Sequence, residues 1–338
     1  MPYIPEEQQR KAEQEAGRQR EQRSRLLRVI LLVVFSGMVI YSLIRLGGYG
    51  LDLLNSRKTS QELRDAWEAT DIPEATAEAE GGTQNPTGTP EPAETTTQAP
   101  ANTAAPTEAP TPETDEKAAQ AFGNRYPDNP KLKVSSRFQN LRKKSGYIMG
   151  WLKLDGVDEA VVQKDNTFFL NHDAMGNRNV NGAIFLDEGI SLLDRPPCLL
   201  LYGHNMKTGA MFGNLKKFEQ SGYAYKHRII TCDTLYEEGT FVVFAVGQIS
   251  IVRGTARFAD LYALTSLDEG VRQEALNSLI ACDMTGSVTD VSAKDQLLLL
   301  ITCTSDDDQR LVVAARRLRE GEAEDNIQMK TLSRLTTP

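Results

Sequence analysis

The chain has 338 residues and a formal net charge of −8. This acidity argues against a nucleic-acid partner, because binding to phosphate groups needs a basic surface. The sequence has no cysteine and histidine cluster with zinc-ligand spacing and no glycine-rich phosphate-binding loop, so we expect neither a metal nor an organic cofactor.

The N-terminal region has the pattern of a basic segment followed by a membrane anchor. Residues 1–28 are polar and rich in arginine, and residues 29–46 are apolar apart from Arg45. This stretch is long enough for a transmembrane helix if the flanking arginines extend to the two interfaces. A cleaved signal peptide is the alternative, but no small-residue cleavage site follows and the charged region is long. Because arginines crowd the N-terminal flank, we expect a single-pass anchor with a cytoplasmic N-terminus and the C-terminal bulk outside.

Two further segments precede the folded part of the chain. Residues 47–72 have helical spacing with mixed charge, which predicts a juxtamembrane helix. Residues 73–120 consist mainly of Thr, Ala, Pro and Glu with almost no large apolar side chain. Such a stretch cannot bury enough surface to offset its ordering entropy, so we expect a disordered stalk. We also expect a fragment beginning near residue 121 to fold alone, because the span and the stalk share no core with it.

The folded domain is expected over residues 126–325. A basic stretch near its start predicts a solvated helix, and short runs rich in Val, Ile, Leu and Phe follow after Gly150. This pattern predicts one all-β domain with inserted helices, large enough to bury a core. The expected strands are Trp151–Leu154, Ala160–Val162, Ala183–Leu186, Cys198–Tyr202, Arg228–Thr231, Thr240–Ile251, Leu297–Thr302 and Arg310–Ala315.

One inserted helix is expected over residues 266–282, where Ser266 with Glu269 resembles a capping box. Its expected apolar face comprises Leu267, Val271, Ala275, Leu276, Leu279 and Ile280. Three of the four cysteines lie beside apolar stretches, which favours buried free thiols at Cys198, Cys232 and Cys282.

The fourth cysteine stands in a different setting. Cys303 ends an apolar strand and begins a polar loop, His204 follows another apolar strand, and Arg310 begins the strand after the loop. Taken singly, Cys303 would be a buried thiol, His204 a surface histidine and Arg310 an edge charge. His172 and His227 are the other candidates for a catalytic histidine. Two antiparallel strands joined by a short loop would, however, place Cys303 beside Arg310. A thiol, an imidazole and a guanidinium together are what thiol acyl transfer needs.

These residues resemble the sortases, and within them the class B group. The strand end Thr302-Cys303, the turn Gly203–Met206 and the strand Gln309–Val313 carry the resemblance, which covers about 145–318. Ile301 before Thr-Cys, Ala160 before Val-Val and the seven-residue spacing from cysteine to arginine depart from the family's pattern. Further matching segments are Gly150–Leu154, Val161–His172, Gly182–Asp187 and Gly209–Leu215.

The resemblance implies a closed sortase-type β-barrel and a membrane-anchored cysteine transpeptidase outside the cytoplasm. Cys303 would attack a Thr carbonyl in a C-terminal sorting motif of a secreted protein, and a peptidoglycan-precursor amine would resolve the thioacyl-enzyme. His204 would act as general acid and base, and Arg310 would bind the oxyanion or the motif's backbone. Such chemistry needs no cofactor. The expected substrate contacts are Asn205, Met206, Thr302 and Asp306.

Two rival functions remain open at this point. A pilin-polymerising sortase would use a Lys of another pilin subunit as the acceptor. A non-catalytic barrel that binds the cell wall or a protein partner would leave Cys303 inert. The three aspartates that follow Cys303 would either orient His204 or the substrate, or form a solvated acidic loop.

Overall fold

The computed structural model describes residues 6–69 and 126–322, so the expected stalk over 73–120 lies outside the described residues. The chain divides into two compact units, one up to Asn55 and one from Ser56 onward. Helix α1 runs over Glu6–Glu68 and contributes to both units. Among the described residues, one helix, Ile30–Glu68, is long and apolar enough to cross a membrane, with a mean hydropathy of 2.1 in its most apolar window.

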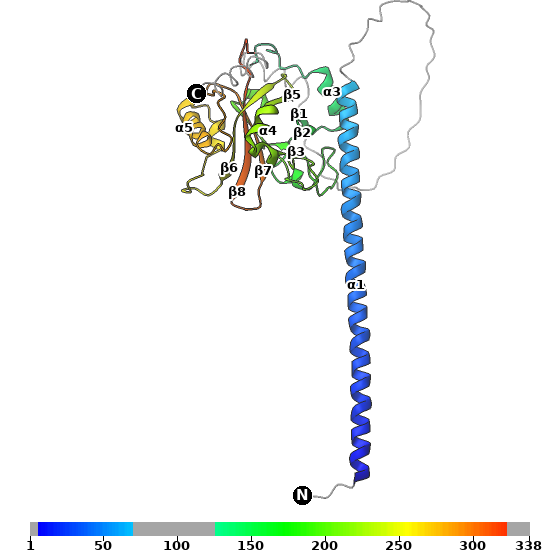
Figure 1. The fold of residues 1–338 in the computed structure, drawn as a ribbon. Coiled ribbons are helices and arrows are strands. Elements are labelled where there is room, and N and C mark those ends of the chain that lie inside the picture. The colour runs from blue at the N-terminus through cyan, green and yellow to red at the C-terminus, as the bar shows by residue number, and fades with distance from the viewer. Residues whose placement is uncertain (1–5, 70–125, 323–338) are drawn as a thin grey trace, which may run out of the picture. The chain divides into compact units, whose positions relative to one another are not determined.

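The second unit is built on a closed barrel of eight strands (Figure 1). The strand order around the barrel is β1-β2-β3-β4-β7-β8-β6-β5, and the pairs β2/β3 and β4/β7 are parallel. The predicted all-β barrel with inserted helices is confirmed. The strands are β1 Ile148–Leu154, β2 Val157–Val162, β3 Ile184–Leu186, β4 Cys198–Tyr202, β5 Ile229–Thr234, β6 Thr240–Ser250, β7 Leu297–Cys303 and β8 Gln309–Arg317.

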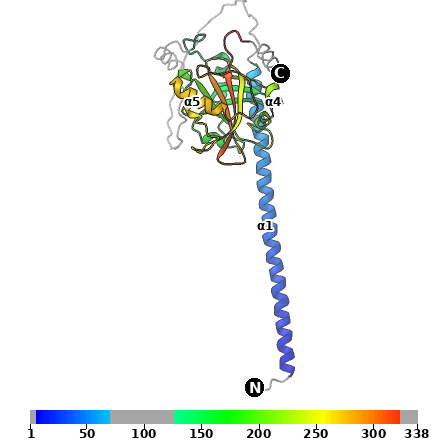
Figure 2. The same cartoon turned by 60° about the vertical axis from the view of Figure 1, so that its left-hand side comes forward.

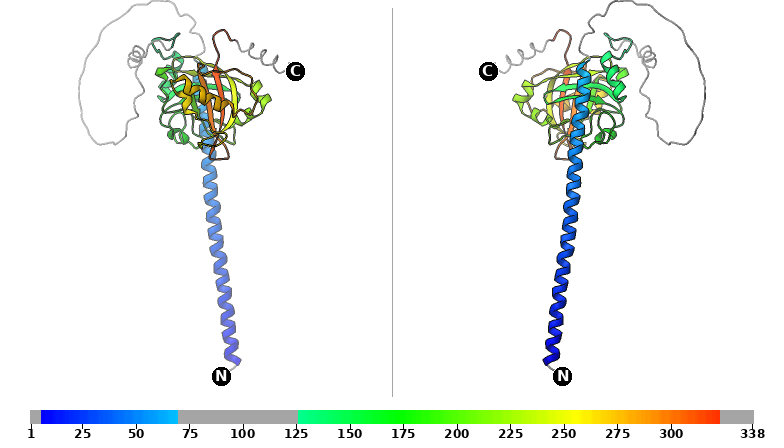
Figure 3. Two further views of the ribbon diagram at one scale, coloured as in Figure 1. Left: turned by 90° about the vertical axis from the view of Figure 1, so that its left-hand side faces the viewer. Right: turned by 90° about the vertical axis from the view of Figure 1, so that its right-hand side faces the viewer.

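Short helices lie before the first strand and in the connections between the strands. Helix α5 lies against the outside of the barrel, where the turn that follows it bonds to β6 through Met284 N and Val246 O (Figures 2 and 3). The α-helices are α3 Ser136–Lys144, α4 Ser221–Lys226 and α5 Glu269–Ile280, and the 3₁₀ turns are η2 Phe168–Leu170, η3 Leu192–Asp194, η4 Leu215–Glu219 and η5 Tyr262–Thr265.

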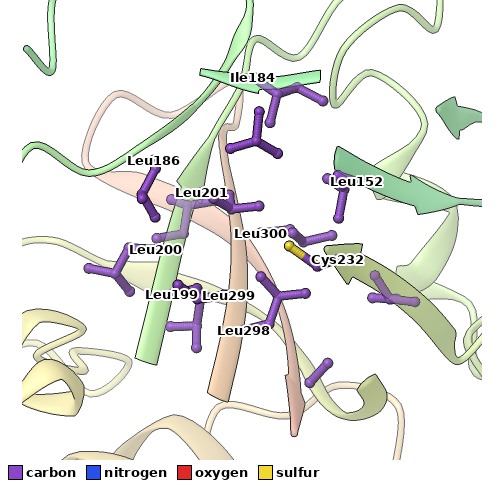
Figure 4. Packing of buried hydrophobic residues seen from close by; sticks show 14 of the residues in the cluster. Leu152, Ile184, Leu186, Leu199, Leu200, Leu201, Cys232, Leu298, Leu299 and Leu300 are labelled. Atoms are coloured by element: carbon purple, nitrogen blue, oxygen red, sulfur yellow. The ribbon is translucent and has the colours of Figure 1, made fainter. Parts of the chain in front are cut away.

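The core is densest where β4 and β7 run side by side. Leu199–Leu201 pair in register with Leu298–Leu300, and all six side chains are at most 2% exposed (Figure 4). Both strands are apolar at successive positions, as expected of parallel neighbours covered on both faces. Because these two strands are rigidly packed, the residues at their ends are held in fixed positions.

The three cysteines expected to be buried free thiols are buried and free. Burial raises the pKa of Cys198, Cys232 and Cys282 above that of an ordinary thiol. These thiols are therefore poor nucleophiles, whereas Cys303 is exposed.

Helix α5 differs from its predicted form at its start and on its face. Its N-cap is Asp268, whose side chain accepts from the Val271 N–H, so the predicted Ser266–Glu269 capping box is wrong. Leu267 precedes the helix and is 76% exposed, because the barrel covers only a narrow stripe of α5. Exposed positions 271 and 280 also lie outside that stripe, which consists of Ala275, Leu276 and Leu279.

The end of α1 is part of the barrel's core, which the sequence pattern did not indicate. Leu63 is 1% exposed, and Trp67 stacks on Trp151 of β1 with ring centroids 4.9 Å apart. Arg64 donates to the Asp158 carbonyl of β2 at 3.0 Å. Residues 56–68 therefore fold together with a barrel whose first strand begins at Ile148, eighty residues later in the chain.

This packing predicts that Trp67→Ala destabilises the second unit. Large aromatic-to-alanine changes in cores cost about 3–5 kcal/mol, and we expect the lower end of this range because Trp67 is 8% exposed, more than most of the core. Denaturant unfolding of a fragment that starts at Ser56 measures the effect, with Leu267→Ala as an exposed control. A fragment that starts at residue 121 lacks Leu63 and Trp67 and should be correspondingly less stable.

Glu159 of β2 makes the stability of the contact between α1 and the barrel depend on pH. Burial raises the pKa of Glu159 to about 7. A hydrogen bond from Ser60 and the charge of Arg64 lower this pKa, and the nearby charge of Asp158 raises it, but burial has the largest effect. Because the folded-state pKa exceeds that of the unfolded chain, this contribution to stability is complete below about pH 4.5 and is lost as the pH rises through 7.

Glu159→Gln should therefore stabilise the unit at pH 8 by on the order of 1–3 kcal/mol and have little effect at pH 4.5. Denaturant melts at the two pH values measure this difference, and the exposed Glu274→Gln serves as a control. An equal effect of Glu159→Gln at both pH values would contradict the prediction.

Candidate active site

Cys303 is presented at the end of a buried strand. Residues 297–302 of β7 are all buried, and Cys303 is the first exposed position. Strand β7 lies between β4, which is parallel, and β8, which is antiparallel. A strand held on both sides fixes the position of its last side chain while the loop beyond it stays open to ligands.

Arg310 lies beside Cys303 on the neighbouring strand. The two residues are register partners in the β7–β8 ladder, so their side chains project to the same face of the sheet. The guanidinium Nη1 donates to the carbonyls of Asp307 at 2.7 Å and Gln309 at 2.8 Å. The short loop between the strands thus contacts the guanidinium of Arg310 and limits its movement.

His204 is brought to Cys303 by the parallel pairing of β4 with β7. Tyr202 pairs with Ile301, so His204 follows β4 at the level where Cys303 ends β7. The two chain segments remain bonded beyond the strands, since the Thr302 hydroxyl donates to the Gly203 carbonyl at 2.6 Å. The strand pairing therefore brings together the chain positions of the three residues that the sequence singled out.

The imidazole of His204 makes one further contact. Its Nε2 lies 2.7 Å from the carbonyl oxygen of Leu170, in the turn that follows β2. The sequence resemblance to the sortases included this segment but did not indicate the contact. Every residue has a main-chain carbonyl, so the residue type at position 170 does not reveal its partner. The other two histidines have separate partners, Phe168 O for His172 and Asp155 for His227.

The four expected substrate contacts occupy different positions. The Asn205 amide donates to the Cys303 carbonyl at 2.9 Å, which ties the histidine turn to the cysteine strand. Met206 is partly buried against the core, and Thr302 is 2% exposed with its hydroxyl turned toward Gly203. Asp306 accepts from Asp308 N and from the Gln309 amide, so its carboxylate organises the loop after Cys303.

Exposed apolar side chains border the site. Leu170 is 43% exposed beside His204, and Ile251 is 50% exposed where its N–H bonds to the Asp308 carbonyl. Tyr262, which is 56% exposed, bonds to Tyr202 of β4 and to the buried Asp187. The sequence did not single out Tyr262, which lies at least forty residues from any residue of the expected site.

The described residues contain no group of three His, Cys, Asp or Glu side chains that could hold a metal ion. The side chains around Cys303 instead offer a nucleophilic sulfur, an imidazole and a guanidinium within one bonded framework. This arrangement suits acyl transfer through a covalent thioester.

Comparison with known proteins agrees with this chemistry. The family model of the sortase domain matches residues 153–318. Sortase B of Staphylococcus aureus is 29% identical over 176 residues, which cover 50% of this chain and 68% of that protein. Sortase B of Listeria monocytogenes is 28% identical with the same coverage. A solved Staphylococcus aureus sortase B–substrate complex matches with a TM-score of 0.50 at 25% identity, over 62% of this chain and 95% of that one.

The barrel, the sequence match and the relatives together define a cysteine transpeptidase of the sortase type. Residues 153–318 form a sortase domain, and its similarity to the two sortase B proteins makes it class B-like.

Proposed function

We propose that this protein is a membrane-anchored transpeptidase that joins secreted proteins to a cell-wall amine. Its substrate would carry a C-terminal sorting motif, and Cys303, His204 and Arg310 would carry the reaction. The observation behind this proposal is the pairing of an exposed cysteine with an arginine across β7 and β8, beside a histidine turn bonded to the same strand.

In the first half-reaction, the Cys303 sulfur forms a bond to the backbone carbonyl carbon of a Thr in the motif. Arg310 stabilises the oxyanion as the C–N bond breaks, and protonated His204 gives its proton to the leaving amine. In the second half-reaction, an incoming amine loses a proton to His204 and attacks the thioester, which frees the Cys303 thiolate and restores the imidazolium.

The membrane anchor is proposed over residues 29–46, with residues 1–28 in the cytoplasm and the catalytic domain outside. Its support is the one long apolar helix found among the described residues and the arginines on its N-terminal flank. Residues 73–120 would form a stalk, and residues 126–325 would form the catalytic domain with the docked residues 56–68. An anchor of this kind would hold the enzyme where secreted precursors emerge.

Intact-mass measurement tests the proposal. A panel of peptides that carry candidate sorting motifs should produce an adduct on the protein that hydroxylamine releases, as expected of a thioester. Two acceptors then separate the two kinds of product, namely a peptidoglycan-precursor amine and a peptide with a pilin-like Lys. Transfer to the precursor amine supports the proposal, transfer only to Lys would indicate pilin polymerisation, and the absence of any adduct with every peptide would contradict the proposal.

A further inference from the structure

The hydrogen bond between His204 and Leu170 determines which ring nitrogen carries the proton. A carbonyl oxygen can only accept a hydrogen bond, so Nε2 of His204 must be the donor across the 2.7 Å contact. A neutral imidazole has one N–H, so Nδ1 then holds the lone pair.

We propose that the Leu170 carbonyl and the glycine at position 182 position His204 and fix its Nε2–H tautomer, so that Nδ1 is the nitrogen that exchanges protons during the reaction. Leu170 and Gly182 are positioning residues in this view, since neither needs to touch the substrate for this effect. The inference rests on the proposed role of His204 as general acid and base.

The Leu170 carbonyl is held firmly by the turn η2. The carboxylate of Asp165 accepts from the backbone N–H of Thr167 at 3.0 Å and of Phe168 at 2.8 Å, which holds the start of this turn in place. Phe169 is fully buried, and its carbonyl accepts from the Ala183 N–H at 3.0 Å. Because η2 is fixed at both ends, the next carbonyl along the chain is presented to His204 without reorganisation.

Gly182 leaves the space that this contact requires. It has φ +62, and a Cβ atom there would lie 2.3 Å from the Phe169 carbonyl oxygen. The same Cβ would lie 3.2 Å from both the Leu170 oxygen and His204 Cδ2, the ring carbon bonded to Nε2. A side chain at position 182 would therefore push the carbonyl and the ring apart.

This assignment identifies the ring nitrogen that gives or receives the proton in each step of the reaction. The imidazolium carries protons on both nitrogens, and it gives the Nδ1 proton to the leaving amine while Nε2–H stays on Leu170. The incoming amine then returns a proton to Nδ1. The ring keeps its orientation through both steps, so no ring flip is needed between leaving-group protonation and amine deprotonation.

Nitrogen NMR on the full-length protein in detergent tests the tautomer directly. The chain has three histidines, so His172→Gln with His227→Gln leaves His204 as the only labelled imidazole. In the neutral state we expect the Nε2–H tautomer alone, together with a through-hydrogen-bond coupling to the Leu170 carbonyl carbon. Free histidine populates both tautomers, so a detectable Nδ1–H population in the otherwise unmodified site would overturn the proposal.

Gly182→Ala connects the tautomer to the reaction. We expect both tautomers to appear and kcat to fall about 10²-fold with little change in KM, because misplacement of a catalytic group by about 1 Å has this effect. Gly176→Ala is the matched control, since Gly176 also has positive φ, +85, in the same loop but contacts Tyr147 instead of His204. It should leave both the tautomer and kcat unchanged.

The two readouts separate this inference from the proposed function. A pure Nε2–H tautomer in a protein that forms no thioester would contradict the function and leave the positioning intact. Normal kcat in Gly182→Ala with a mixed tautomer would overturn the inference alone. An equal loss of kcat in Gly176→Ala would also overturn it, because the loss would then come from general strain in the loop.

Discussion

Replacing Cys303 by alanine is expected to abolish both cleavage of a motif peptide and formation of the thioester adduct. Cys303 is the one exposed cysteine of the four in the chain, and all four lie in the part that the structure describes. Without the sulfur no covalent intermediate can form, and the remaining groups have no nucleophile to assist. The expected loss is complete within the detection limit of an intact-mass assay.

The buried cysteines provide the controls for this experiment. Cys198, Cys232 and Cys282 are at most 4% exposed, and burial raises the pKa of each thiol. Alanine at any of these positions should preserve adduct formation, even where the smaller side chain lowers the free energy of unfolding. An adduct that persists in Cys303→Ala and maps to another cysteine would refute the assignment of the nucleophile.

Arg310→Lys is expected to reduce the rate nearly as much as Arg310→Ala. The guanidinium is planar and can offer paired N–H donors, whereas an ammonium is a single point charge. Nη1 of Arg310 already bonds to the carbonyls of Asp307 and Gln309, and a guanidinium with five N–H groups retains donors for an oxyanion. Loss of one oxyanion donor typically lowers the rate on the order of 10²–10³-fold.

Single-turnover rates of adduct formation measure this effect, and denaturant melts measure stability. The free energy of unfolding should change little, because a partly exposed charge contributes little to stability. Arg253→Lys is the matched control. Arg253 is exposed, forms an ion pair with Asp260 at 2.6 Å, and comes two residues after Ile251, one of the exposed apolar side chains that border the site. If Arg310→Lys keeps most of its rate, Arg310 acts only as a nearby positive charge.

The short loop between Cys303 and Arg310 is stabilised by its own side chains. The sequence allowed either a solvated acidic loop or aspartates that orient His204 or the substrate. In the structure Asp306 accepts from the N–H of Asp308 and from the Gln309 side chain, and Asp308 O accepts from Ile251 N. The acidic residues therefore shape the loop that contacts Arg310, which explains how a seven-residue spacing can still form a paired site.

Much of the catalytic part could be predicted from the sequence because it depends on local patterns. Apolar runs of strand length marked most of the barrel, and polar loops marked the ends where Cys303 and His204 lie. The order of these segments supported the family resemblance, which supplied the barrel topology. Pattern alone placed the helix before β7 but misjudged its cap and its buried face, since both depend on what the barrel covers.

Contacts between distant segments could be decided only by the tertiary structure. Residues 56–68 look like an exposed amphipathic helix in sequence, and only the stacking of Trp67 on Trp151 shows that they belong to the core. The carbonyl of Leu170 reaches His204 across 34 residues, and a backbone oxygen leaves no trace in residue type. The sequence by itself determined which side chains could perform acyl transfer, because that depends on their chemistry. The fold alone decided which of them meet and which neighbours orient them, because that depends on strand register and packing.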